Sequence, residues 1–322
     1  MGLSLEEGAG IVIERWCKVR PGEKVLILSD ECHVEESMAM WTAADQRGTE
    51  VTLVTIQEHR SHPGKVLHSM ADFVLHHDLV VGATNFSILT NRIVKQVLSR
   101  GGRFLSLPLS NGKGPPALTL DFMAMDPAEA ERTGRGMLEA LRQAESVHVT
   151  TALGTDLHFG KRGRTPGLFN GLADQPGKAG SSSFEIYIGI EETVTTGRAV
   201  VDGSLGYLGR PETPIQLTFR QGRLVEIGGE AGEGLRRYMN SFGDRGIYVA
   251  GELGIGLNKI SRCKGNCYIE DESTFTTFHI GMGRNLALGG VHDAAGHFDL
   301  VFQFPTIYAD DILIMKDGFP VV

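Results

Sequence analysis

The stretch KVLILSD, residues 24–30, decides the fold class of the first half of the chain. It is an apolar, β-branched run of strand length, and a helical pattern over residues 34–47 follows it and ends at Gly48. A second strand pattern occupies residues 50–56. The order strand, helix, strand is typical of a βαβ unit on a parallel sheet.

The same alternation continues to about residue 145. Further strands are predicted over residues 78–83 and 103–109, and helices over residues 91–100 and 126–144. The pattern therefore predicts a Rossmann-like α/β domain with a parallel sheet. The residues after the first strand read DECH where a dinucleotide-binding domain has a glycine-rich loop, so we do not expect dinucleotide binding.

From residue 146 onward, short strands and glycine turns dominate. Hairpins are predicted over residues 147–159 and 213–227, and one helix over residues 232–241. A chain of 322 residues is long enough for two domains with separate cores. We expect an α/β domain, residues 1–145, followed by a mostly β (α+β) metal-binding catalytic domain, residues 146–322.

Composition excludes several classes of partner. The net charge is −8 and no basic cluster is longer than residues 161–164, so a nucleic-acid surface is not expected. No apolar run approaches the ~20 residues of a membrane span, and the acidic N-terminus does not resemble a secretory signal. The four cysteines lack the spacing of a structural zinc site and are expected to be reduced thiols. We expect a cytoplasmic protein that acts on a small molecule or a peptide.

Potential metal ligands gather in the last seventy residues. Glu252 stands in the apolar segment GELGIG, His279 in FHIGMG, and His297 and Asp299 in GHFD, with His292 nearby. A lone histidine in an apolar strand is more often a core residue than a ligand. However, His297 and Asp299 are two apart and share one face of a strand, and a carboxylate in an apolar segment needs a partner or a metal. Together these residues predict a divalent-metal site.

Five motifs in this order resemble the thermophilic metalloaminopeptidase family, of the aminopeptidase T type. They are GTDL at 154–157, FEIY at 184–187, GEL at 251–253, HIGMG at 279–283 and HFD at 297–299. The resemblance implies a homodimer with two divalent ions per chain, zinc, cobalt or manganese, in the second domain. It also implies a set of metal ligands, with the first two as the candidate catalytic residues: Glu185, Glu252, His279, His297 and Asp299.

The chain departs from this family at one position. The family has a tyrosine seven residues after the equivalent of His279, and here that residue is Leu286. A related branch, similar to 2,5-dihydroxypyridine 5,6-dioxygenase, uses one iron, keeps the His-x-Asp pair and has histidine in place of the glutamate of the Gly-Glu motif. Because Glu252 and His279 are both present, the resemblance places the chain closer to the hydrolases.

The expected activity is therefore aminopeptidase-like hydrolysis of an amide bond by a metal-activated water. No general base stands out; Glu191 and Glu192 are candidates, and Arg162 and Arg164 are candidates for binding a substrate carboxylate. Three alternatives stay open. They are a mononuclear iron ring-cleaving dioxygenase, a hydrolase of a small cyclic amide, and a metal-binding protein without catalysis.

Overall fold

The computed structural model describes residues 2–57, 64–112 and 114–322. Its contacts divide the chain into two units, each made of two segments. The first unit consists of residues 1–127 and 169–183, and the second of residues 128–168 and 184–322. Each unit is described separately below.

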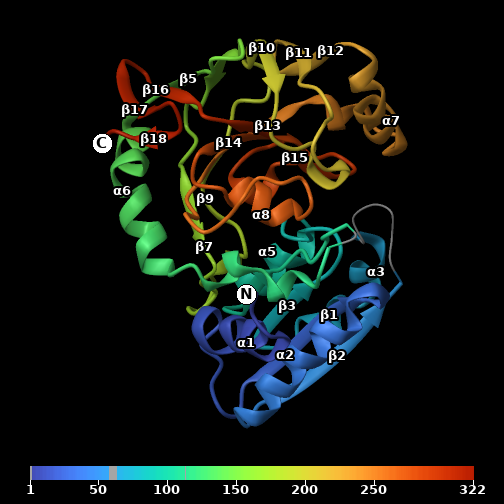
Figure 1. Ribbon diagram of the computed structural model, residues 1–322. Coiled ribbons are helices and arrows are strands. Elements are labelled where there is room, and N and C mark those ends of the chain that lie inside the picture. Colours follow the sequence, from blue (N-terminus) through green and yellow to red (C-terminus); the bar gives the residue numbers. More distant parts are fainter. Residues whose placement is uncertain (1, 58–63, 113) are drawn as a thin grey trace. The chain divides into compact units, whose positions relative to one another are not determined.

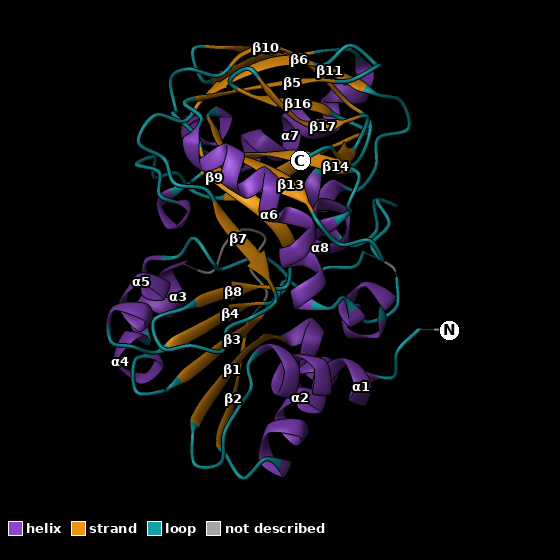
Figure 2. Ribbon diagram, turned by 90° about the vertical axis from the view of Figure 1, so that its left-hand side faces the viewer, coloured by secondary structure: helices purple, strands orange, loops and turns teal. Residues whose placement is uncertain are grey.

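The first unit is a parallel sheet covered by helices on both faces. Within the described residues its strand order is β2-β1-β3-β4-β8. Figure 2 shows α1 and α2 on one face of this sheet, and α3, α4 and α5 on the other. The strands are β1 (Lys24–Asp30), β2 (Glu50–Ile56), β3 (Leu79–Ala83), β4 (Arg103–Ser106) and β8 (Ala179–Ser181). The helices are α1 (Leu5–Gly10), α2 (Val34–Gln46), α3 (Gly64–Ser69), α4 (Ala71–Val74) and α5 (Arg92–Ser99).

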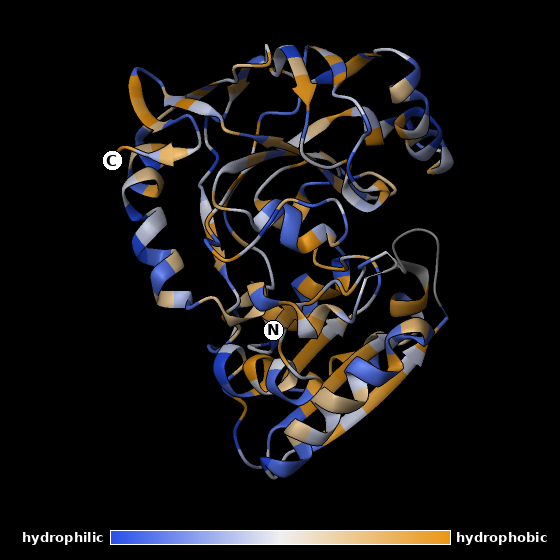
Figure 3. Ribbon diagram, viewed as in Figure 1, coloured by the Kyte–Doolittle hydropathy of each residue, from blue (hydrophilic) through white to orange (hydrophobic). Residues whose placement is uncertain are grey.

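This layered arrangement confirms the predicted α/β fold with a parallel sheet. A parallel sheet with helices on both faces buries both sides of its strands, so its strands read as continuous apolar runs. Figure 3 shows hydrophobic stretches within the strands of the first unit, and β3 is buried throughout.

The second unit contains two sheets, which bears out the mostly β character expected of it (Figure 1). The first has the order β12-β11-β10-β6-β5-β16-β17-β18, and the second the order β15-β14-β13-β9-β7. The first comprises β5 (Ser146–Thr150), β6 (Asp156–Gly160), β10 (Thr196–Val201), β11 (Ile215–Arg220), β12 (Arg223–Ile227), β16 (Thr306–Ala309), β17 (Ile312–Lys316) and β18 (Phe319–Pro320). The second comprises β7 (Gly167–Asn170), whose last two residues are assigned to the first unit, β9 (Phe184–Gly189), β13 (Ala250–Gly256), β14 (Thr277–Gly283) and β15 (His297–Gln303). The helices are α6 (Pro127–Gln143), α7 (Glu233–Ser241) and α8 (Tyr268–Ser273).

The division into units differs from a single boundary near residue 145. Almost all of α6 belongs to the second unit, because Gly134 faces the side chains of Ile186 and Leu257, and a Cβ there would lie within 3.4 Å of both. Residues 169–183 return to the first unit, because β8 pairs with β4 at the edge of the parallel sheet. Sequence periodicity shows where helices and strands lie, but not which sheet a short strand joins.

Two further sequence expectations concern the whole chain. Among the helices of residues 2–57, 64–112 and 114–322, none is long and apolar enough to cross a membrane. The same residues contain no disulfide bond, and two of the cysteines, Cys17 and Cys267, are buried thiols.

A buried arginine on β4, Arg103, bonds to three other segments of the first unit. Arg103 is 5% exposed, its Nη2 lies 2.8 Å from Glu23 Oε2, and its Nη1 donates to the carbonyl oxygens of Cys17 and Ala173. We expect Arg103→Met to lower the free energy of unfolding by about 3 kcal/mol, because it leaves the Glu23 carboxylate and two carbonyls without this donor. Urea denaturation would measure the change. The control is Arg100→Met at an exposed position, and an equal loss in both variants would contradict the prediction.

Candidate metal centre

Four neighbouring strands of the second unit have two different faces. Along β9, β13, β14 and β15, which run antiparallel, successive side chains point to opposite sides of the sheet. One face carries apolar side chains, among them Phe278 and Phe302, whose rings stack with centroids 4.5 Å apart. All five sequence-predicted ligands lie on the other face. We call it the polar face.

The polar face alternates large polar side chains with glycines in paired positions. Glycine is needed where two large side chains meet across a pair of strands. Gly281 shows this directly, because a Cβ at this residue would lie 2.5 Å from His297 Cε1 and 2.7 Å from Glu252 Oε2. The pairs are Glu185 with Gly256, Tyr187 and His279 with Gly254, Glu252 and Asp299 with Gly281, and His297 with Gly283.

The five residues form one continuous buried group. His279 Nε2 lies 2.7 Å from Glu185 Oε2, and His297 Nε2 lies 3.1 Å from Glu252 Oε2 and 3.4 Å from Asp299 Oδ1. Ligand atoms of Glu185, Glu252 and His279 lie within 4.8 Å of one another, as do those of Glu252, His297 and Asp299. Each residue is less than 9% exposed. The structure thus brings together all five residues of the predicted ligand set.

The orientation of His297 is fixed by the backbone. Its Nδ1 lies 2.8 Å from the carbonyl oxygen of Arg284, which can only accept a hydrogen bond, so Nδ1 carries the proton. The other ring nitrogen, Nε2, then faces the carboxyl groups of Glu252 and Asp299. A histidine whose second nitrogen donates to a carbonyl is the usual form of a metal-binding histidine.

Tyr268 and Glu272 also belong to this buried group, although the sequence does not predict them, and both lie on α8. This short helix packs against β9, β13, β14 and β15. The Tyr268 hydroxyl donates a hydrogen bond to Asp299 Oδ2, and the Tyr207 ring stacks on the Tyr268 ring with centroids 4.1 Å apart. Glu272 is 5% exposed, and its carboxyl group interacts with Asp299. We call Glu185, Glu252, Glu272, His279, His297 and Asp299 the ligand cluster.

The ionisation of the cluster reflects crowded carboxyl groups in a buried space. Burial raises the pKa of Glu252 to about 7, and burial together with the charge of Asp299 raises the pKa of Glu272 well above its usual value. Burial lowers the pKa of His279, but the charge and hydrogen bond of Glu185 outweigh it and bring this pKa to about 9. The pKa of Asp299 is lowered despite its burial, mainly by the charge of His297.

The other sequence candidates have different roles. His292 Nε2 bonds to the carbonyl oxygen of Gly246, 2.9 Å away, so it is not part of the ligand cluster. Glu192 pairs with Arg164 at 2.7 Å and accepts hydrogen bonds from Asn285 and from the backbone of Val291. Arg162 pairs with Glu145, and Glu191 accepts from the Arg162 backbone. Leu286 lies in the short 3-10 turn Leu286–Leu288, and a tyrosine that donates to Asp299, Tyr268, comes from α8 instead.

The donor set fits a divalent cation. Four carboxyl groups and two imidazoles share a space from which solvent is largely excluded, and buried carboxylates need a cation or protons to offset their charge. His279 Nδ1 is also buried and has no hydrogen-bond partner among the described residues. Imidazole and carboxylate ligands bind zinc, manganese and iron alike, so the donor types do not identify the metal.

Comparison with known proteins narrows the class of enzyme. The family model described as 2,5-dihydroxypyridine 5,6-dioxygenase matches residues 13–321. The 2,5-dihydroxypyridine 5,6-dioxygenase of Pseudomonas putida is 28% identical over 260 residues, which are 75% of this chain and 70% of that protein.

Two solved structures share the fold along nearly the whole chain. The structure of 2,5-dihydroxypyridine dioxygenase from Pseudomonas putida superposes with a TM-score of 0.81 and 23% identity, covering 99% of this chain and 97% of that one. AmpT from Thermus thermophilus superposes with a TM-score of 0.70 and 15% identity, covering 99% of both chains. At these identities the two structures establish the fold alone.

The prediction of an aminopeptidase-like amide hydrolase is wrong. The family match along residues 13–321 and the sequence relative both point to a dioxygenase, and the zinc and protease assignments are overturned with the hydrolase. The hydrolase prediction rests on the presence of Glu252 and His279. These donors suit the metals of both enzyme classes, so their presence does not separate the two. The expected likeness to aminopeptidase T holds at the level of the fold.

Proposed function

The chain belongs to the 2,5-dihydroxypyridine 5,6-dioxygenase family, and from this premise we propose that it is a metal-dependent dioxygenase that opens a hydroxylated pyridine ring. The observation that carries the proposal is the family match over residues 13–321. A buried group of carboxyl and imidazole side chains in the same chain supports it, because such enzymes require a metal site with these donors.

We propose iron as the metal. Oxygenases of the non-haem iron class hold their metal with two histidines and one carboxylate. His279 and His297 would supply the imidazoles and Asp299 the carboxylate, with Glu252, which has ligand atoms within 4.8 Å of those of both histidines, and Glu185 beside them. A bound iron(II) ion would supply the electron transfer to dioxygen that protein side chains do not provide.

The chain's own residues would orient the site. The Arg284 carbonyl fixes the His297 ring, and the Tyr268 hydroxyl holds Asp299 through its Oδ2 atom, which leaves Oδ1 directed toward His297. Such hydrogen bonds fix the direction of a ligand and tune its basicity. The residues of the ligand cluster are also each less than 9% exposed, and exclusion of water from a site limits side reactions.

The decisive experiment uses purified protein loaded with iron(II) under anaerobic conditions. With 2,5-dihydroxypyridine and dioxygen we expect loss of the aromatic absorbance, uptake of one O₂ per ring, and both atoms of ¹⁸O₂ in the open-chain product. Aminoacyl anilides serve as the comparison substrates and should not be hydrolysed. If iron-loaded protein leaves every dihydroxypyridine isomer intact, the proposed reaction is incorrect.

Tyr268→Phe tests the support of Asp299. We expect metal affinity and ring cleavage to fall by about 10–100-fold with the fold unchanged, because Asp299 Oδ2 loses its donor. The matched control is Tyr207→Phe, which removes a hydroxyl from the adjacent stacked ring and leaves the Asp299 hydrogen bond in place. Calorimetric titration with iron(II) and the initial rate would be measured for both. Equal behaviour of the two variants would assign Tyr268 a packing role only.

We also propose that the protein is a homodimer that acts on a small molecule. The first part rests on the resemblance to the metalloaminopeptidases, and the second on the family to which the chain belongs. Sedimentation velocity over a range of protein concentrations would measure the mass. A monomer throughout that range would contradict the dimer.

A further inference from the structure

A second group of potential ligands lies on the eight-stranded sheet, apart from the ligand cluster. Strands β5 and β6 pair antiparallel, with His148 directly opposite His158 and Thr150 opposite Asp156. Cross-strand partners and residues two apart share one face, so these three polar side chains point to the same side. Their exposed fractions, 34% for His148, 66% for Asp156 and 60% for His158, show that this face is open to solvent.

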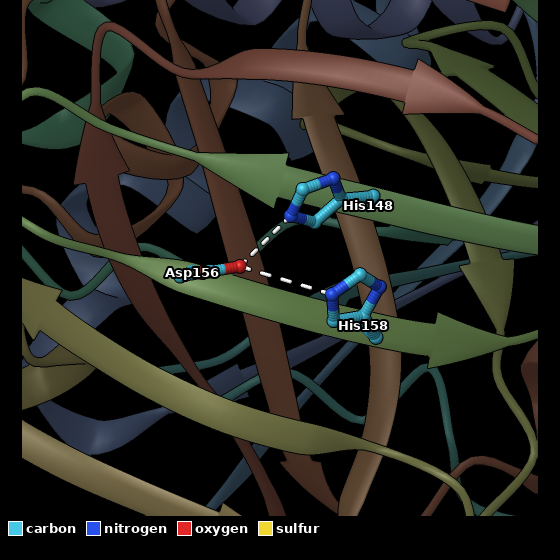
Figure 4. A group of neighbouring side chains, drawn as sticks. All are labelled: His148, Asp156 and His158. Carbon is cyan, nitrogen blue, oxygen red and sulfur yellow. Dashed lines mark hydrogen bonds and ion pairs between the residues drawn. The ribbon is translucent and has the colours of Figure 1, made fainter. Parts of the chain in front are cut away.

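The three side chains converge on one point. Asp156 Oδ1 lies 2.8 Å from His148 Nε2 and 3.8 Å from His158 Nε2, and one ligand atom of each lies within 4.8 Å of the other two. The two imidazole rings stack face to face, with centroids 4.1 Å apart and an interplanar angle of 5°. Figure 4 shows both rings turning a nitrogen toward the single carboxylate.

We propose that His148, Asp156 and His158 form a second metal site, which binds a transition-metal cation such as Zn²⁺ or Ni²⁺ at the protein surface. Two imidazoles and one carboxylate are a common three-ligand set for these cations, and water completes the coordination. Ligand bonds of about 2.0–2.2 Å require only small side-chain rotations from this spacing. Strand pairing fixes the backbone of all three residues, so little conformational entropy is lost on binding.

Residues paired with this site on the adjacent strands β16 and β10 influence its affinity for a cation. Tyr308 on β16 lies opposite His148 and stacks with it, with ring centroids 6.2 Å apart, which limits the motion of that imidazole. Arg198 on β10 lies opposite Asp156 and brings a positive charge to the same face. This charge opposes a bound cation, so the site should be weaker than the buried cluster, which has four carboxyl groups. Arg198→Gln should therefore tighten binding at the surface site.

The test is calorimetric titration of Zn²⁺ into metal-free protein, in which the buried cluster fills first and the surface site gives a later, weaker phase. Iron(II) would not block the buried cluster, because Zn²⁺ displaces it from the same donors. We expect about one further ion per chain in the wild type, and an affinity at least about tenfold weaker in His148→Gln and in His158→Gln. The control is His68→Gln, which removes an exposed histidine of α3. Gln keeps the size and polarity of an exposed side chain, and circular dichroism would verify the fold.

The surface site can be separated from the proposed enzymatic site. Asp299→Asn should leave the surface site unaffected, and His158→Gln should leave ring cleavage unaffected, so failure of one proposal does not imply failure of the other. A wild-type protein that binds no further Zn²⁺, or that binds it as tightly in the double variant His148→Gln/His158→Gln, would overturn the proposal. Tighter binding in Arg198→Gln would support it further.

Discussion

Asp299→Asn is expected to abolish metal binding and reduce ring cleavage by more than about 100-fold. The substitution keeps the size of the side chain but removes the one carboxylate of the ligand cluster whose pKa is lowered, and with it the charge that faces His297. Loss of the residues that merely orient a metal ligand already costs about 10–100-fold, so loss of a ligand should cost more. Metal content by mass spectrometry and the initial rate would be measured on the same preparation.

The control for Asp299→Asn is Asp311→Asn. Asp311 is an exposed carboxylate at the turn between β16 and β17, so its loss changes the net charge equally without touching the ligand cluster. Retention of one iron per chain and of at least half the rate by Asp299→Asn would rule out Asp299 as a ligand. The His297→Ala variant should behave like Asp299→Asn, because the two side chains are neighbours on the polar face.

Gly281→Ala is expected to be almost as damaging, although it removes no functional group. The added Cβ would overlap His297 Cε1 and Glu252 Oε2, at 2.5 and 2.7 Å, and both atoms belong to buried side chains with little room to move. Overpacking of this kind costs about 1–3 kcal/mol of stability, and displacement of reactive groups by about 1 Å costs on the order of 100-fold in rate. Thermal unfolding and the initial rate would measure the two effects.

The same substitution at Gly234 provides the control. Gly234 lies in α7, where an added Cβ meets nothing within 4 Å, so Gly234→Ala should leave activity unchanged and slightly raise stability. A fully active and fully stable Gly281→Ala variant would mean that the polar face can relax around an extra methyl group. That result would weaken the idea that glycines determine the geometry of the cluster.

The sequence predicts the elements of the fold well. Residues 24–30 and 50–56 form β1 and β2 with the expected bounds, because β-branched apolar runs have few alternatives to a buried strand. Helix α6 occupies residues 127–143, close to the expected 126–144. What periodicity could not supply is the order of strands, since β9 pairs with β13 across the sixty residues 190–249. The residues of a strand do not indicate which distant strand it pairs with.

The candidate site was predicted in part, and for two different reasons. Glu252 is predictable because a carboxylate in an apolar segment is costly to bury, whereas Glu185 is predicted only through the resemblance to the metalloaminopeptidases. Glu272 is not predicted as a ligand because its segment, IEDES at 269–273, has the composition of a charged surface turn. The structure buries it by laying α8 across four strands. Burial that depends on tertiary packing leaves no periodic signal in the sequence.

The return of residues 169–183 to the first unit has a consequence for synthesis on the ribosome. When residue 127 has emerged, the parallel sheet still lacks its edge strand β8, and the Arg103 guanidinium still lacks the Ala173 carbonyl. At about 5–20 residues per second, the missing segment follows several seconds later. The first unit therefore remains incomplete during synthesis, with the β4 edge of its sheet unpaired, until residues 128–168 of the second unit have been made.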